Sequence, residues 1–194
     1  MEKILQKLSD KINSASDINE HLDNLKKYAS ECDIIIEMGV RAINSTWAFL
    51  AAKPKKLVSI DFQHPSVFDV NIEEVSDLAK ENDIDFEFRL QNTLECEIEE
   101  CDLLFIDTWH DYLQLKCEIY RHEKKVRKYI IFHDTNSFGF RNEDNYETYS
   151  LGREETNLPK GLIPAIDEFL FSNKEWYIHE RFANNNGITI IKRK

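Results

Sequence analysis

The sequence predicts an α/β fold in which a mostly parallel sheet has helices on both faces. The strongest evidence lies in residues 101–136, where two apolar runs, 103–106 and 129–132, flank a charged stretch long enough for a crossover helix. A third apolar run, at 33–36, is β-branched and does not alternate with polar residues, as expected for a strand covered on both faces. Together these observations indicate parallel strands joined by helices.

Apolar spacing and turn residues predict the other elements in chain order. Two N-terminal helices carry apolar residues at helical spacing, and the second starts near Asp17. A strand at 56–60, a helix at 70–81, a strand at 86–90 and a helix at 162–171 follow. The chain closes with two strands, 176–182 and 188–191, around an Asn-rich turn that ends at Gly187, which is typical of an antiparallel hairpin.

Length and composition favour one domain over residues 1–194, with residues 1–30 as an N-terminal helical cover. A net charge of −11 argues against a nucleic-acid-binding or anionic-membrane-binding surface. The four cysteines lack CxxC spacing, so no disulfide framework is expected. The N-terminus is too charged for a secretory signal, and no apolar run approaches the ~20 residues that span a bilayer. These features predict a cytoplasmic protein without a membrane anchor.

Acidic residues and histidines follow the predicted strands where ligands bind in an open α/β sheet. Asp107 and Asp134 end two of these strands, with His110 and His133 close by in sequence. Asp61 ends the strand at 56–60, about 20 residues beyond the first βα turn, where nucleotide-binding sheets place a carboxylate that binds ribose hydroxyls. The alternative is that these aspartates only cap the helices or turns that follow them.

Two other loops at the same edge carry candidate ligand-binding residues. The first strand leads into Glu37 and Gly39, and the next helix is preceded by Ser45 and Thr46, so a ligand loop is plausible here. Asn92 with Thr93 follows the strand at 86–90, and this pair could bind an adenine edge or simply close a turn. The polar segment 137–160 is long for a compact domain, which favours a lid over the site, with a disordered surface loop as the alternative.

The order of these strands and residues resembles class I S-adenosylmethionine-dependent methyltransferases, which have a Rossmann-like seven-stranded sheet whose last strand is antiparallel. The segments EMGVRAINSTWAFL, DLLFIDTWHDY, YIIFHDT and GLIPAIDEFL are similar to the small sugar and macrolide O-methyltransferases and cephalosporin hydroxylase-type proteins. The resemblance extends from Ile18 to the C-terminus. Its most specific parts are FID-x-x-H-x-Y and F-H-D-T.

The resemblance implies roles for individual residues. Those matching S-adenosylmethionine-binding positions are Glu37, Gly39, Ser45, Thr46, Asp61, Asn92, Thr93 and Asp107. Asp107 and Asp134 match the carboxylates that hold a divalent ion in metal-dependent members, and oxygen ligands suit Mg²⁺. Departures from the family pattern are Ile43 and Asn44, where relatives often carry glycines, and His133, where some metal-dependent relatives carry an acid.

The resemblance implies methylation of a small hydroxylated substrate, such as a sugar or glycoconjugate. His110 would act as the base that takes the hydroxyl proton, with Asp107 as the alternative. His110 could instead cap the helix or pack beside Trp109. Two other functions stay open: a scaffold that keeps the fold without catalysis, and a nicotinamide-dependent oxidoreductase, against which the absent G-x-G-x-x-G counts. The amphipathic N-terminal helices could also form a homodimer contact.

Overall fold

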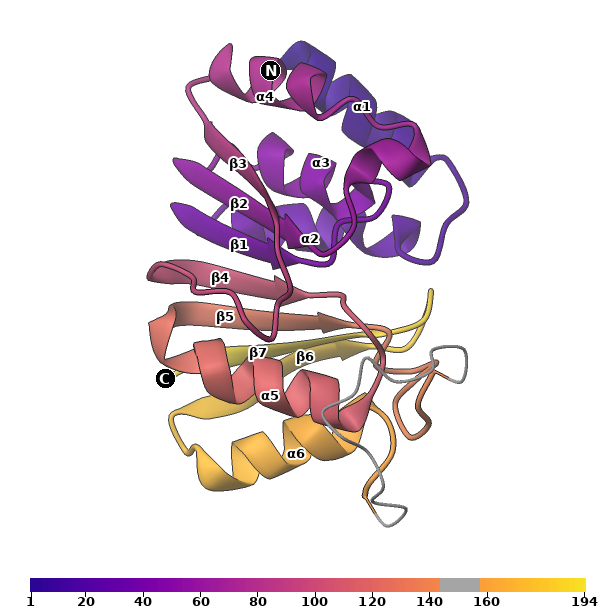
Figure 1. Ribbon diagram of the computed structural model, residues 1–194, viewed down its shortest axis with the longest axis vertical. Helices are drawn as coiled ribbons and strands as arrows, with labels where there is room; N and C mark the ends of the chain where they lie inside the picture. Colours follow the sequence, from indigo (N-terminus) through magenta and orange to yellow (C-terminus); the bar gives the residue numbers. More distant parts are fainter. Residues whose placement is uncertain (144–157) are drawn as a thin grey trace.

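A mixed sheet forms the centre of the computed structural model, which describes residues 1–143 and 158–194. The sheet has seven strands in the order β3-β2-β1-β4-β5-β7-β6 (Figure 1). Neighbouring strands pair in parallel from β3 to β5, whereas β7 is antiparallel to both β5 and β6. The strands are β1 (Ile34–Met38), β2 (Lys56–Asp61), β3 (Asp85–Leu90), β4 (Cys101–Ile106), β5 (Val126–His133), β6 (Trp176–Phe182) and β7 (Ile188–Arg193).

Helices cover both faces of this sheet because the strands bury side chains on both faces. In β4, Leu103 and Phe105 belong to one apolar cluster with residues of α1 to α4, and Leu104 and Ile106 belong to a second cluster with α5 and α6. Figure 1 shows α5 and α6 together on the near face. The helices are α1 (Glu2–Ile12), α2 (Leu22–Ala29), α3 (Asn44–Ala51), α4 (Ile72–Lys80), α5 (Tyr112–His122) and α6 (Leu162–Ser172). The predicted α/β class and C-terminal hairpin are confirmed.

Backbone hydrogen bonds hold the ends of neighbouring strands together at the carboxyl edge. The Gly39 amide donates to the Ile60 carbonyl at 2.9 Å, and the Asp107 amide donates to the Met38 carbonyl at 2.8 Å. Gly39 has φ +84°, and a Cβ added there would lie 1.9 Å from the carbonyl oxygen of Asp107. Only glycine permits this close approach, so Gly39 fixes the first βα turn against the end of β4.

The N-terminal segment differs from the prediction in one respect. The second helix starts at Leu22, after a short 3-10 turn (Asn19–His21), rather than near Asp17. Asp17 lies outside the helix and forms an ion pair with Arg41. His21 is buried, and its Nε2 lies 2.9 Å from the Asn184 carbonyl oxygen.

The predicted lid falls partly outside the described residues, at 144–157. Its two described ends are joined, because the Gly161 amide donates to Asn142 Oδ1 at 2.7 Å and the Leu162 amide donates to the Phe138 carbonyl at 3.0 Å. None of the described helices has the length and apolarity needed to cross a bilayer.

Candidate active site

A pocket of about 340 Å³ lies at the carboxyl edge of the sheet, between the N-terminal segment 16–18 and the β1–α3 loop. Asp107, at the end of β4, lines one part of it. The other lining residues are Ser16, Asp17, Ile18, Val40, Arg41, Ala42, Asn44, Ser45 and Phe68. The sequence-predicted residues Ser45 and Asp107 therefore face one cavity.

Asp61 shapes this pocket by holding the β1–α3 loop. Its Oδ2 accepts hydrogen bonds from the backbone amides of Val40 at 2.7 Å and Arg41 at 3.1 Å, and its Oδ1 accepts from the Gln63 amide at 2.9 Å. The loop takes left-handed backbone angles at Arg41 (φ 42°) and Ile43 (φ 54°). A β-branched residue rarely adopts positive φ. The loop reaches this conformation with Arg41 and Ile43 at backbone angles that glycine adopts more easily.

Glu37 lies beneath the loop, fully buried. Its carboxylate accepts hydrogen bonds from Ser45 Oγ at 2.5 Å, Thr46 Oγ1 at 2.8 Å and Ser59 Oγ at 2.5 Å. Burial raises the pKa of Glu37 to about 7, although the three hydroxyl donors oppose that shift. Glu37 and Thr46 therefore hold the start of α3 in place, and direct contact between either residue and a cofactor stays a prediction.

Asp107, His110 and Asp134 form a cluster next to the pocket, with candidate metal-binding atoms all within 4.8 Å of one another. His110 Nε2 lies 2.8 Å from Asp134 Oδ2 and 3.7 Å from Asp107 Oδ1. On the other side of the ring, His110 Nδ1 lies 2.9 Å from Glu143 Oε2. Phe138 stacks on the ring with a centroid distance of 4.5 Å. The structure thus brings the predicted acid and histidine residues together and fixes the orientation of His110.

The charges in this cluster stabilise one another. Burial alone would lower the pKa of His110, but hydrogen bonds and charge from Asp107 and Asp134 outweigh burial and raise it to about 10. Burial alone would raise the pKa of Asp107, but His133 and His110 outweigh it and hold that pKa below its usual value. His133 is buried, with Nδ1 3.2 Å from Asp107 Oδ1 and 3.0 Å from Asp134 Oδ2. In this arrangement His110 carries a proton at neutral pH.

The same cluster fits a divalent cation. Two carboxylates and an imidazole are a common donor set for such ions. Asp134 Oδ1 is buried and has no hydrogen-bond partner within the described chain, so it has a lone pair free to coordinate a metal. Asp107 and Asp134, the predicted metal carboxylates, therefore have suitable chemistry.

Asn92 and Thr93 are held in contacts that close a turn after β3. Asn92 Oδ1 accepts a hydrogen bond from the Leu94 amide at 3.0 Å. Thr93 Oγ1 donates to Glu118 Oε1 at 2.5 Å, and the Thr93 carbonyl lies 3.0 Å from His122 Nε2. Recognition of adenine by this pair stays a prediction.

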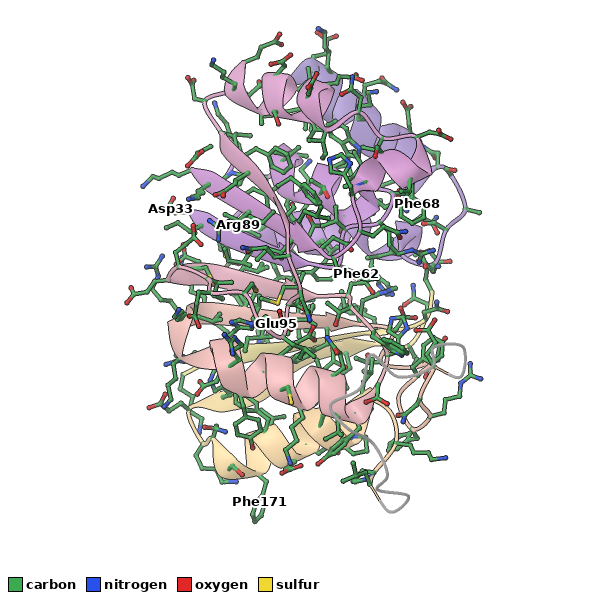
Figure 2. The ribbon with its side chains drawn as sticks, viewed as in Figure 1. Asp33, Phe62, Phe68, Arg89, Glu95 and Phe171 are labelled. Atoms are coloured by element: carbon green, nitrogen blue, oxygen red, sulfur yellow. The ribbon has the colours of Figure 1, made fainter. Side chains whose placement is uncertain are left out.

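The pocket-lining charges of Asp17 and Arg41 were not predicted from the sequence as site residues. Also not predicted were Phe68, which lines the pocket, and Phe62, directly after Asp61, which is 69% exposed and lies outside that lining. Figure 2 shows both at the side of the sheet where the parallel strands end, opposite Asp33. An aromatic residue directly after a strand-end acid was the available signal for Phe62. Glu143, which contacts His110, lies in a polar segment whose sequence alone gives no such signal.

Comparisons with known proteins identify relatives by structure alone. No family model and no curated protein matches the sequence. The O-methyltransferase from Bacillus cereus, solved with SAH, superposes with a TM-score of 0.62 at 15% identity, over 100% of this chain and 90% of that one.

Two other solved structures match in the same way. TomG from Streptomyces achromogenes, an O-methyltransferase of tomaymycin synthesis solved with SAM, gives a TM-score of 0.62 at 14% identity, over 97% of this chain and 89% of that one. The ribosomal protein L11 methylase from Lactobacillus delbrueckii gives 0.55 at 15% identity, over 90% and 79%. At sequence identities this low, the structural similarity shows the fold alone. The printed roles of these proteins, in tomaymycin synthesis and on a ribosomal protein, differ too much for the fold to indicate a substrate.

Proposed function

Because the chain has the Rossmann-like fold of small class I methyltransferases, we propose that it transfers a methyl group from S-adenosylmethionine to a hydroxyl oxygen of a small molecule. One observation carries this proposal: Asp107 belongs both to the pocket at the carboxyl edge and to the cluster with His110 and Asp134. A cofactor in the pocket and an acceptor at the cluster would meet at this residue. A sugar or glycoconjugate is the acceptor class that the sequence resemblance suggests.

The residues around the pocket suit the parts of this cofactor. The exposed ring of Phe62 offers a flat apolar surface to adenine. Each carboxylate oxygen has two lone pairs, so Asp61 can accept hydrogen bonds from ribose hydroxyls while it holds the loop. The negative charge of Asp107 favours a positively charged sulfonium beside it.

The protein has two tasks in this reaction. A sulfonium already activates its methyl group, so the pocket must align the acceptor oxygen in line with that group and exclude water. The acceptor hydroxyl must also lose its proton. A divalent ion held by Asp107 and Asp134 would supply positive charge that lowers the pKa of His110 and of the acceptor hydroxyl. His110, held by Glu143 and Phe138, presents Nε2 to the side where the two carboxylates lie, and with its pKa lowered it would take the proton of the acceptor hydroxyl.

We propose Mg²⁺ as this ion, since carboxylate oxygens suit it. A cytoplasmic location is consistent with the absence of disulfides at Cys32, Cys96 and Cys101 among the described residues. A homodimer contact through α1 and α2 stays a prediction.

Two features of the β1–α3 loop count against the scaffold alternative. The loop has left-handed backbone angles at Arg41 and Ile43 although neither residue is glycine, and the pocket beside the loop is open.

Calorimetric titration with S-adenosylhomocysteine, with and without Mg²⁺, tests the proposal. We expect micromolar affinity, and separately we expect Mg²⁺ binding that Asp107→Asn weakens. Asp33→Asn is the matched control, because Asp33 is an exposed aspartate at the opposite edge of the sheet (Figure 2). A protein that binds no S-adenosylhomocysteine in either condition would contradict the proposal.

A further inference from the structure

We infer that Asp17 and Arg41 together bind the amino-acid end of the cofactor, with Arg41 on its carboxylate and Asp17 on its ammonium group. This inference rests on the proposed function and assigns two residues that no sequence motif singled out. The two residues form an ion pair of opposite charges in the wall of the pocket.

Both charges face the pocket from two separate segments. Arg41 belongs to the β1–α3 loop and Asp17 to the N-terminal segment, and both line the cavity. Arg41 Nη1 donates to Asp17 Oδ2 at 3.0 Å. The Arg41 side chain is 68% exposed and that of Asp17 40% exposed, so neither charged group is buried in the core.

The backbone beneath each side chain is fixed. The Arg41 amide donates to Asp61, and Arg41 has a left-handed φ of 42°. Next to Asp17, the Ser16 carbonyl accepts a hydrogen bond from Asn185 Nδ2 at 2.8 Å. The pocket therefore presents its two charges from anchored positions.

The amino-acid end of S-adenosylmethionine carries the complementary charges. Its carboxylate matches the planar donor fork of a guanidinium, and its ammonium group matches a carboxylate acceptor. An exposed ion pair contributes little stability, so Asp17 and Arg41 can separate at small cost. Each can then form a charge-assisted hydrogen bond to the ligand.

The remaining pocket lining does not supply these charges. Asp107 is the third charged residue in the lining, and it is already paired with His110 and His133. The other lining residues are uncharged. Asp17 and Arg41 are therefore the groups in this wall that can neutralise a zwitterion.

The test compares two ligands by calorimetry: S-adenosylhomocysteine, and 5′-methylthioadenosine, which lacks the amino-acid end. Arg41→Gln and Asp17→Asn should each lower the affinity for S-adenosylhomocysteine about tenfold, which corresponds to the loss of one hydrogen bond of ~1.4 kcal/mol. Neither should change the affinity for 5′-methylthioadenosine. Arg41→Lys, which keeps the charge, should restore part of the loss. Lys55→Gln and Asp33→Asn are matched controls, since this exposed pair, 2.9 Å apart, lies outside the pocket lining.

Three results would overturn the inference. If a pocket variant lowers the affinity for both ligands equally, the residue shapes the pocket and does not bind the amino-acid end. If neither variant changes the affinity for S-adenosylhomocysteine, the pair has no role in binding. If the unaltered protein binds neither ligand, the proposed function fails and the inference fails with it, a result distinct from the first two.

Discussion

Replacing Glu37 with glutamine should reverse its effect on stability between acidic and basic pH. The carboxyl is fully buried under the β1–α3 loop, where Ser45, Thr46 and Ser59 donate hydrogen bonds to it. Burial raises its pKa to about 7 from a reference value of 4.5. Glutamine keeps the size and one acceptor oxygen of the side chain and removes the charge.

The size of the effect follows from the two pKa values. Between pH 4.5 and 7, folded Glu37 keeps a proton that the unfolded chain has lost, so the free energy of unfolding falls as pH rises through this range. At ~1.36 kcal/mol per pKa unit, the ionised carboxylate costs about 3 kcal/mol above pH 7. Glutamine removes this cost. It requires the Ser45 hydroxyl to turn and accept a hydrogen bond, at about 1 kcal/mol independent of pH.

Urea unfolding at pH 4 and pH 8 measures the reversal. We expect Glu37→Gln to be about 1 kcal/mol less stable than the wild type at pH 4 and about 2 kcal/mol more stable at pH 8. Glu118, whose pKa burial also raises to about 7, is present in both proteins, so its contribution cancels. Glu81→Gln, at an exposed position just after α4, is the control. A stability difference that is the same at both pH values would refute the reasoning.

Three other substitutions test the carboxyl edge. Gly39→Ala should lower the free energy of unfolding by about 3 kcal/mol or more, because its Cβ would clash with the Asp107 carbonyl at positive φ; wild-type stability in urea would contradict this. Asp61→Ala leaves three backbone amides without their acceptor, so a loss of about 3 kcal/mol is expected, and an equally stable variant would be evidence against the account. Phe62→Ser should change stability by less than about 0.5 kcal/mol yet weaken S-adenosylhomocysteine about tenfold, and an unchanged dissociation constant would argue against adenine stacking.

The central strands β1, β4 and β5 were predictable because they are largely buried on both faces and appear in the sequence as continuous apolar runs. The runs at 103–106 and 129–132 located β4 and β5, and the turn at Gly187 located the hairpin. Strand ends then placed Asp61, Asp107 and Asp134 at one edge without any knowledge of side-chain contacts.

Contacts between distant segments were not predictable in the same way. Asp61 and Glu37 look like ligand residues in the sequence, yet Asp61 also accepts hydrogen bonds from the β1–α3 loop, and Glu37 accepts them from hydroxyls of α3 and β2. α2 starts at Leu22, after the 3-10 turn Asn19–His21, and in that turn the Glu20 amide donates to Asn185 Oδ1, 165 residues away in the chain. Glu118 did carry a signal, since an acid on the buried side of α5 requires donors, here Thr93 and Thr108.

A crystal structure of the complex with S-adenosylhomocysteine would test the central claim most directly. We predict that the ligand occupies the pocket between residues 16–18 and the β1–α3 loop, with adenine against Phe62 and sulfur towards Asp107. The amino-acid end should lie between Asp17 and Arg41. A ligand bound elsewhere, or an empty pocket at a saturating ligand concentration, would contradict a methyltransferase function for this site.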